Sequence, residues 1–309
     1  MSTKSFYEFH EKYGFWGKKN FSSYINFEQI NNKKIDISHN EFGIREKNFT
    51  IEKTKKRVLC FGGSHTWGAA VNQEKRYSDI LNSHNIEEFL NFGQCSFGID
   101  QILIYLKNEM IKFKPDTIII EQYPWALLRV INNYVNGYVR PFFYIDDNGG
   151  VREKKLPNIL KISIFRNIFG NYLSFKKEYN EYISDIEFNH NFIDPIFKLW
   201  NQNFYNDMYK ISQFIFNEIK NICKVNDINL LIVVNSVKEE LFYESKSLLI
   251  DYNIPRFKLL EILNYLELNY VDVSNEMKNF HKNTDVMYSD GHINEIGNQI
   301  IAKNIRDRL

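Results

Sequence analysis

The segment that decides the fold is RVLCFGGSHTWGAAV, residues 57–71. It opens with a short apolar run, 57–61, which is bounded by polar residues and is typical of a buried strand. Two glycines then permit a sharp turn, and a stretch compatible with a helix follows. A strand that passes through such a turn into a helix is a building unit of an α/β fold.

Four more apolar runs are bounded by polar or turn residues in the same way. They are EFLNF (88–92), TIIIE (117–121), NLLIVV (229–234) and YVDV (270–273). Helical periodicity lies between them, with one stripe at 102–113, a longer one at 197–222 and a last one at 296–309. We therefore predict a three-layer α/β/α sandwich with a parallel five-stranded, flavodoxin-like sheet, whose functional groups gather at the carboxyl ends of the strands.

Two regions fall outside this alternation. Residues 1–56 form an N-terminal extension that we expect to pack on the main domain, 57–309. Within that domain, residues from about 130 to 195 form an insertion that exceeds ordinary loop lengths. We expect the insertion to contain helices of its own and to lie as a lid over the strand ends.

Composition narrows the classes of partner. The 309 residues carry 39 Lys and Arg against 38 Asp and Glu, a net charge of +1, so the chain has no basic field for nucleic acid. Its three cysteines are far apart, which predicts reduced thiols. Because no leader-like or membrane-length apolar run is present, we expect a cytoplasmic protein without membrane contact. The oligomeric state is left open.

Ser64 is a candidate nucleophile, because the turn after the first strand would expose its hydroxyl at the strand end. The following backbone N–H groups would face a developing negative charge. An ordinary βα turn, in which Ser64 only caps the helix, explains the motif equally well.

The second candidate block is YSDGHINEIGNQIIAKNI, 288–305. It places Asp290 and His292 just before the last helix, where a carboxylate can orient a histidine that acts as general base. A solvated Asp-Gly-His turn is the alternative. His281 and Asp285 lie nearby, but the four residues lack tight ligand spacing, so no metal site is expected.

Together these two blocks resemble those of the SGNH (GDSL-type) hydrolase family. Further segments carry the resemblance: HNEFGIR (39–45), NFGQCSFGIDQ (91–101), PDTIIIEQY (115–123) and NSVKEELFY (235–243). The resemblance implies a catalytic set of Ser64, Asp290 and His292. It also implies an oxyanion hole from the backbone N–H groups of Ser64 and Ser96, where Ser96 stands in place of the usual glycine.

Several positions depart from the family pattern. Gly63 replaces the aspartate that many members carry before the serine, and Trp125 stands where an asparagine usually donates to the oxyanion. Loss of one such donor typically costs about 3 kcal/mol in the transition state. Gln122 or Arg129 would substitute for the missing oxyanion donor. His65 would form part of the wall of the site or contact the substrate.

The last block is Asp-x-His instead of the commoner Asp-x-x-His. Asp290 would then orient His292 less directly, or Asp285 would take over that role.

The resemblance implies a serine esterase that needs no cofactor and removes a small acyl group, such as acetyl, from a carbohydrate or similar small molecule. We expect activity to fall on acidification, since His292 must be neutral to accept a proton. Two alternatives remain open. One is an O-acyltransferase acting on a sugar hydroxyl, favoured by the Asp-x-His spacing and the Lys238-Glu239 segment. The other is a catalytically silent scaffold that binds a glycan or a protein.

Overall fold

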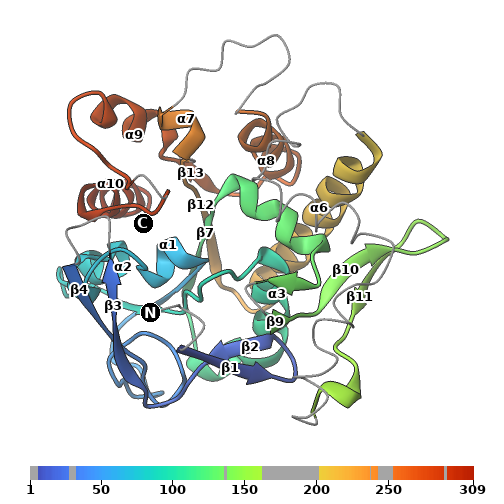
Figure 1. Ribbon diagram of the computed structural model, residues 1–309, viewed down its shortest axis with the longest axis horizontal. Coiled ribbons are helices and arrows are strands. Elements are labelled where there is room, and N and C mark those ends of the chain that lie inside the picture. The colour runs from blue at the N-terminus through green and yellow to red at the C-terminus, as the bar shows by residue number, and fades with distance from the viewer. Residues whose placement is uncertain are drawn as a thin grey trace.

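The computed structural model describes residues 6–27, 33–135, 138–161, 202–236, 238–242, 253–288 and 291–309. At its centre lies a five-stranded sheet in which every neighbouring pair is parallel (Figure 1). The strands, in spatial order, are β13 (Tyr270–Asp272), β12 (Asn229–Val234), β7 (Thr117–Gln122), β5 (Arg57–Phe61) and β6 (Glu88–Asn91). The predicted fold class is confirmed.

Helices cover both faces of the sheet. On one face lie α3 (Ile99–Glu109), α6 (Gln202–Val225) and α8 (Ile254–Tyr265); on the other lie α2 (Tyr77–Asn82), α9 (Ser274–His281) and α10 (Glu295–Arg306) (Figure 1). Short helices α1 (Ser64–Trp67) and α7 (Lys238–Phe242) follow β5 and β12. The three layers follow from the alternation of strand and helix.

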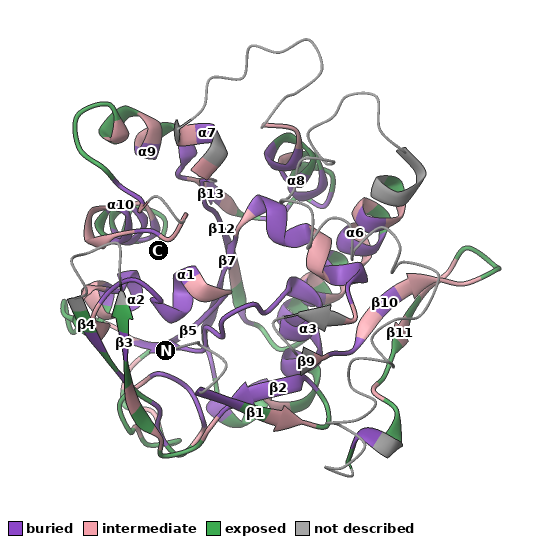
Figure 2. Cartoon of the chain, in the orientation of Figure 1, coloured by how far each residue is buried: buried purple, intermediate pink, exposed green. Residues whose placement is uncertain are grey.

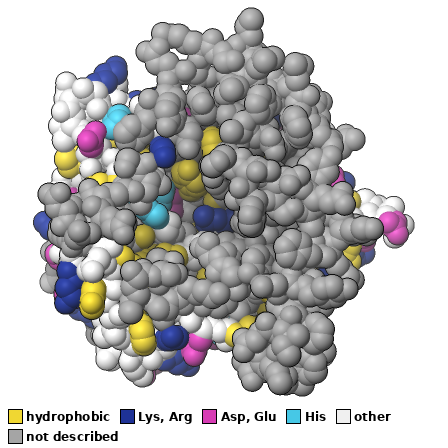
Figure 3. Space-filling model, in the orientation of Figure 1, with side chains coloured by type: hydrophobic (Ala, Val, Ile, Leu, Met, Phe, Trp, Pro, Cys, Tyr) yellow, Lys and Arg dark blue, Asp and Glu magenta, His cyan; other side chains and the backbone are white. Residues whose placement is uncertain are grey.

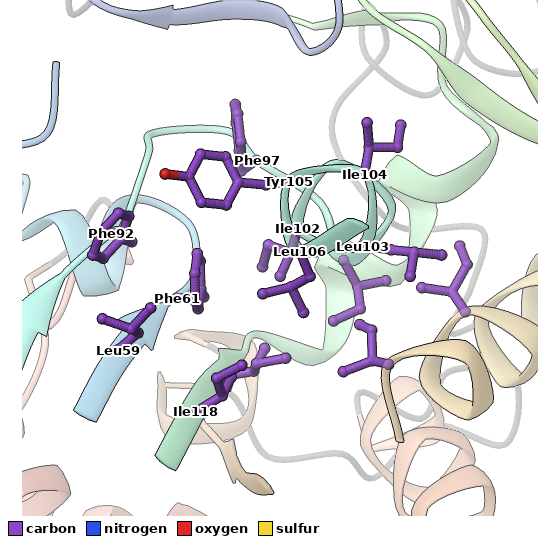
Figure 4. Close-up of a cluster of buried hydrophobic side chains, with 14 of the residues drawn as sticks. Leu59, Phe61, Phe92, Phe97, Ile102, Leu103, Ile104, Tyr105, Leu106 and Ile118 are labelled. Atoms are coloured by element: carbon purple, nitrogen blue, oxygen red, sulfur yellow. The ribbon is translucent and has the colours of Figure 1, made fainter. Parts of the chain in front are cut away.

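The core is divided by the sheet into two parts, because successive side chains of a strand point to opposite faces. Leu59 and Phe61 of β5 belong to the cluster under α3 and α6, whereas Val58 and Cys60 belong to the cluster under α2 and α10. Figure 4 shows the first cluster, in which β5 and β7 side chains meet those of α3. Figure 2 shows that burial is concentrated along the strands and on the helix surfaces that face them.

The sheet order also fixes where a ligand would bind. From β5 the chain passes to β6 at one edge and then returns to β7 on the other side of β5. Such a reversal opens a crevice beyond the carboxyl ends of the strands on either side of it. The loops after β5 and β7 therefore frame the expected site.

The N-terminal segment forms two hairpins that contact the main domain. They are β1 (Tyr7–His10) with β2 (Gly14–Gly17), and β3 (Ser22–Phe27) with β4 (Lys33–Ser38). Trp16 stacks on Tyr105 of α3 with ring centroids 4.8 Å apart, and the Tyr7 hydroxyl accepts a hydrogen bond from the Cys95 amide at 2.7 Å. The loop after β6 is thereby held from the N-terminal side.

The described part of the insertion contains two hairpins, which were not predicted, and the 3-10 helix Asn158–Lys161. Short strands β8 (Tyr134–Val135) and β9 (Tyr138–Val139) pair, as do β10 (Phe142–Ile145) and β11 (Val151–Lys154). The second pairing is favoured by the turn between its strands, where Asp146 Oδ1 accepts from the Gly150 amide at 2.8 Å and Gly149 has a φ of +75°. Most of the insertion, 162–195, and the start of the stripe at 197–201 lie outside the described residues.

The structure also describes the cysteines and the lengths of the helices. Cys60, Cys95 and Cys223 are free and buried. Among the described residues no helix is long and apolar enough to cross a membrane.

Candidate active site

A cleft of about 160 Å³ opens at the carboxyl ends of β5 and β7. Ser64 and His292 both line it, although they are separated by more than two hundred residues in the sequence. Figure 3 shows histidine, acidic, basic and apolar side chains close together near the middle of the visible face. The structure thus brings the two predicted blocks to one crevice.

Ser64 begins α1 directly after the glycine turn. A Cβ at Gly62 would overlap Thr66 Oγ1 and lie 2.9 Å from Glu121 Oε2, so the turn packs too tightly for a side chain. In the described part of the chain, neither the hydroxyl nor the amide N–H of Ser64 has a hydrogen-bond partner. The hydroxyl is therefore free to meet a substrate, and the amide is free to donate to an oxyanion.

His292 is held by the turn that precedes α10. The Tyr288 amide donates to the His292 carbonyl at 2.8 Å, and the Gly291 amide donates to the Tyr288 carbonyl at 2.9 Å. Gly291 has a φ of +91°, a conformation that favours glycine. The ring centroid of His292 lies 5.8 Å from that of His65, the residue after Ser64. This contact places His292 next to the turn that contains Ser64.

The two carboxylates predicted as possible partners of His292 fare differently. Asp290 lies outside the described residues. Asp285 is described, and its Oδ1 lies 3.6 Å from His281 Nδ1, on a side chain that is 78% exposed. The Asp285 carboxylate is therefore engaged at the surface with another histidine.

Behind Ser64 lies a buried polar network that sequence reasoning missed. Asn235 follows β12, and its Nδ2 donates to Glu121 Oε1 of β7 at 3.2 Å and lies 2.5 Å from His65 Nδ1. Thr66 Oγ1 donates to the second Glu121 oxygen at 3.3 Å. The signal was present in the sequence, since a glutamate near the end of TIIIEQ and an asparagine after NLLIVV are polar residues at the carboxyl ends of buried strands.

This network selects the tautomer that an uncharged His65 ring adopts. Asn235 Oδ1 accepts from the Ser236 amide at 2.8 Å, which fixes the orientation of the side-chain amide. Its Nδ2 is then the donor to His65 Nδ1, so the ring carries its proton on Nε2. Since His65 lines the cleft, the network presets how this ring meets a ligand.

The residues proposed to replace the missing oxyanion donor are placed as follows. Gln122 and Arg129 line the cleft, and Gln122 Nε2 donates to the Tyr123 carbonyl at 2.9 Å. Trp125 is 3% exposed and is not among the lining residues. Ser96 is also buried, at a φ of +66°, and does not line the cleft, so its place in the oxyanion hole stays a prediction.

The remaining wall of the cleft is apolar. It is formed by Phe97, Ile99, Ile102 and Ala126. Among the described residues, no group of three or more His, Cys, Asp or Glu side chains is arranged to hold a metal ion. The described cleft thus offers a serine, two histidines, an arginine and an apolar wall.

Comparison with known proteins finds no matching family model and no matching curated protein. Solved structures do match over most of the chain. A putative lipolytic protein of the G-D-S-L family from Desulfitobacterium hafniense DCB-2 has a TM-score of 0.45 at 11% identity, with 82% of this chain and 100% of that chain covered. A G-D-S-L family member from Veillonella parvula DSM 2008 gives 0.45 at 11%, covering 82% and 97%.

A third match is a variant of an acetyl-xylooligosaccharide esterase from Geobacillus, with a TM-score of 0.47 at 9% identity, covering 84% of this chain and 95% of that chain. Structural neighbours of this chain are therefore GDSL-type lipolytic proteins and acetyl xylan esterases, at low sequence identity. At such identities a likeness concerns the fold alone.

Proposed function

We propose that the protein is a serine-dependent ester hydrolase that uses Ser64 as nucleophile and His292 as general base. The single observation that carries this proposal is that both residues line one cleft, at the strand ends where an α/β sheet binds its ligands. The free hydroxyl of Ser64 and the close approach of the two histidine rings support it.

The reaction begins when His292 removes the proton from Ser64 Oγ as the oxygen attacks the ester carbonyl. The carbonyl oxygen becomes an oxyanion, to which the Ser64 amide donates. Collapse of this intermediate breaks the ester C–O bond, and His292 returns the proton to the departing alkoxide. Water, activated by the same histidine, then releases the carboxylic acid and restores the serine.

The cleft favours a small acyl group. Its volume is modest, and its apolar wall of Phe97, Ile99, Ile102 and Ala126 suits a short hydrocarbon such as the methyl of an acetyl ester. The sequence resemblance points to a carbohydrate as the alcohol component of the ester. We therefore propose acetyl esters of sugars or of similar small molecules as substrates.

The test is covalent labelling with a fluorophosphonate, followed by identification of the modified peptide by mass. We expect one label on Ser64, its loss in Ser64→Ala, and a rate lowered by a factor of at least about 10³ in His292→Asn. Ser83→Ala, at an exposed serine at the end of α2, is the matched control and should label normally. A label on another serine, or unchanged ester turnover in Ser64→Ala, would refute the proposal.

A second assay separates hydrolysis from acyl transfer. The protein is mixed with 4-nitrophenyl acetate and a panel of sugars, and free acetate and acetylated sugar are both measured. We expect acetate alone. Acetylated sugar as the main product would instead establish the O-acyltransferase alternative.

A further inference from the structure

Arg129 stands beside the reacting serine. It lies in the 3-10 helix Pro124–Ile131 that follows β7, and its side chain lines the cleft together with Ser64. A Cβ built on Gly63 would be 3.1 Å from Arg129 Nη1, so the guanidinium lies against the residue that precedes the nucleophile. Any ester positioned for attack by Ser64 is therefore within reach of this cation.

The guanidinium has only one hydrogen-bond partner within the described chain. Arg129 Nη1 donates to the Phe97 carbonyl at 2.8 Å, and no described carboxylate lies within 4 Å. A guanidinium has five N–H donors and stays charged in proteins. Donors remain available to a ligand, and Arg129 presents them to the cleft.

Neighbouring charges do not neutralise this cation at close range. Arg140 is buried and pairs with the buried carboxylate of Asp100, so this carboxylate is already committed to another cation. The acid whose field reaches Arg129 is Glu121, whose oxygens accept from Asn235 and Thr66. Burial, reinforced by the charge of Arg140, lowers the pKa of Arg129, which indicates that the charge is poorly compensated without a ligand.

Gly63 keeps the cation accessible. A side chain at this position would crowd Arg129 Nη1, and a carboxylate there would pair with it. Because this residue is a glycine, no acid stands at the place from which Arg129 would be neutralised.

We propose that Arg129 binds a carboxylate on the alcohol part of the substrate, whose acyl group the proposed function places against the apolar wall, so that the preferred ester is anionic. The inference rests on the proposed function and names its substrate class. The acyl group is assigned to the apolar wall, which leaves the alcohol part to carry the charge that the guanidinium recognises. A planar carboxylate matches the paired N–H donors of arginine.

The test compares the release of acetate from two acetyl esters of similar shape, the anion 4-acetoxybenzoate and its neutral methyl ester, methyl 4-acetoxybenzoate. We expect kcat/KM of the wild-type protein to be at least about tenfold higher for the anion, as a charge-assisted hydrogen bond provides. In Arg129→Gln the ratio should fall to about one, and Arg129→Lys should restore part of it. Arg306→Gln, at an exposed arginine of α10, is the control and should keep the wild-type ratio.

Two kinetic results would overturn the inference. One is a wild-type ratio near one. The other is an Arg129→Gln protein that loses activity toward both esters while it keeps the ratio, because Arg129 would then serve the oxyanion or the fold.

Binding of the products 4-hydroxybenzoate and methyl 4-hydroxybenzoate, measured by calorimetry, separates this inference from the proposed function. Preference for the carboxylate that disappears in Arg129→Gln, without any ester turnover, would uphold the anion site and refute the esterase. Turnover without any preference would uphold the esterase and refute the anion site.

Discussion

The arginines behind α1 and the arginine in the cleft differ in how their guanidinium groups are partnered. Behind α1, Arg45 donates to the carbonyls of Trp67, Gly68 and Val71, and Arg76 pairs with Glu46 and Asp79. Both side chains are fully buried. In the cleft, Arg129 has one carbonyl partner and no described acid within 4 Å. A guanidinium that donates to several groups of the protein stabilises the fold, whereas one with unused donors in a cleft is available to a ligand.

The difference in partners also separates stability from recognition. Removing a buried cation that has several partners leaves carboxylates and carbonyls uncompensated, which costs stability. Removing Arg129 leaves a single carbonyl without a donor. Substitutions of the two kinds of arginine should therefore be distinguishable by what they change.

The largest effect is expected for Arg76→Met. This substitution leaves Glu46 and Asp79 without their cation, and burial already raises the pKa of Glu46 against the opposing effect of Arg76. We expect the free energy of unfolding to fall by about 3–5 kcal/mol, measured by urea denaturation. Arg129→Gln is the matched control and should lose only about 1 kcal/mol. Equal losses in the two variants would contradict the distinction.

A fourth arginine, Arg256, lies between these extremes and gives a pH-dependent prediction. Arg256 contacts Glu240 at 3.3 Å and Asp272 at 3.1 Å, yet burial raises the pKa of Glu240 to about 7 because desolvation outweighs the arginine. The folded protein then holds a proton that the unfolded chain releases above about pH 4.5. The contribution of Glu240 to the free energy of unfolding is fully present below that pH. It is lost as pH rises through 7, which lowers the free energy of unfolding by up to about 3 kcal/mol.

The measurement is urea denaturation across this pH range. Glu240→Gln carries no titrating proton and should flatten the slope between pH 4.5 and 7. A variant with the same pH slope as the wild-type protein would show that Glu240 is ionised throughout.

A smaller effect is expected for Gly62→Ala, which places a methyl group against Thr66 and Glu121 beneath the serine turn. Overpacking at such a site costs about 1–3 kcal/mol. We also expect fluorophosphonate labelling of Ser64 to slow, since the turn must shift. Gly150→Ala, in an exposed hairpin turn of the insertion, is the control. Normal labelling of Gly62→Ala would mean that the turn yields without moving the serine.

A still smaller effect on stability is expected for Asn235→Ala, about 1–2 kcal/mol, because Glu121 and His65 each lose one donor. Ester turnover should fall about tenfold, since the His65 ring is no longer held in one orientation. Asn226→Ala, at an exposed asparagine after α6, should change neither property. Unimpaired turnover in Asn235→Ala would assign the network to stability alone.

The sequence allowed the sheet to be predicted because each strand is a contiguous apolar run, and the five runs from 57–61 to 270–273 are the five strands observed. It also allowed Ser64 and His292 to be proposed, because each belongs to a local motif. The contact of Asn235 with His65 and Glu121 joins three segments that are far apart in the sequence, so no local sequence pattern predicts it. The hairpins at 134–154 were not predicted, because the insertion was assigned structure from its length, and length does not specify which segments pair.

One feature of the N-terminal segment bears on how this protein is cut for study. All five strands of the central sheet lie at or after Arg57, so a fragment that starts there would contain the whole sheet. Such a fragment would lack Arg45, whose guanidinium ties together the carbonyls just downstream of the nucleophile. The turn that carries Ser64 is thus held by a residue upstream of the sheet, and a minimal domain must include Arg45.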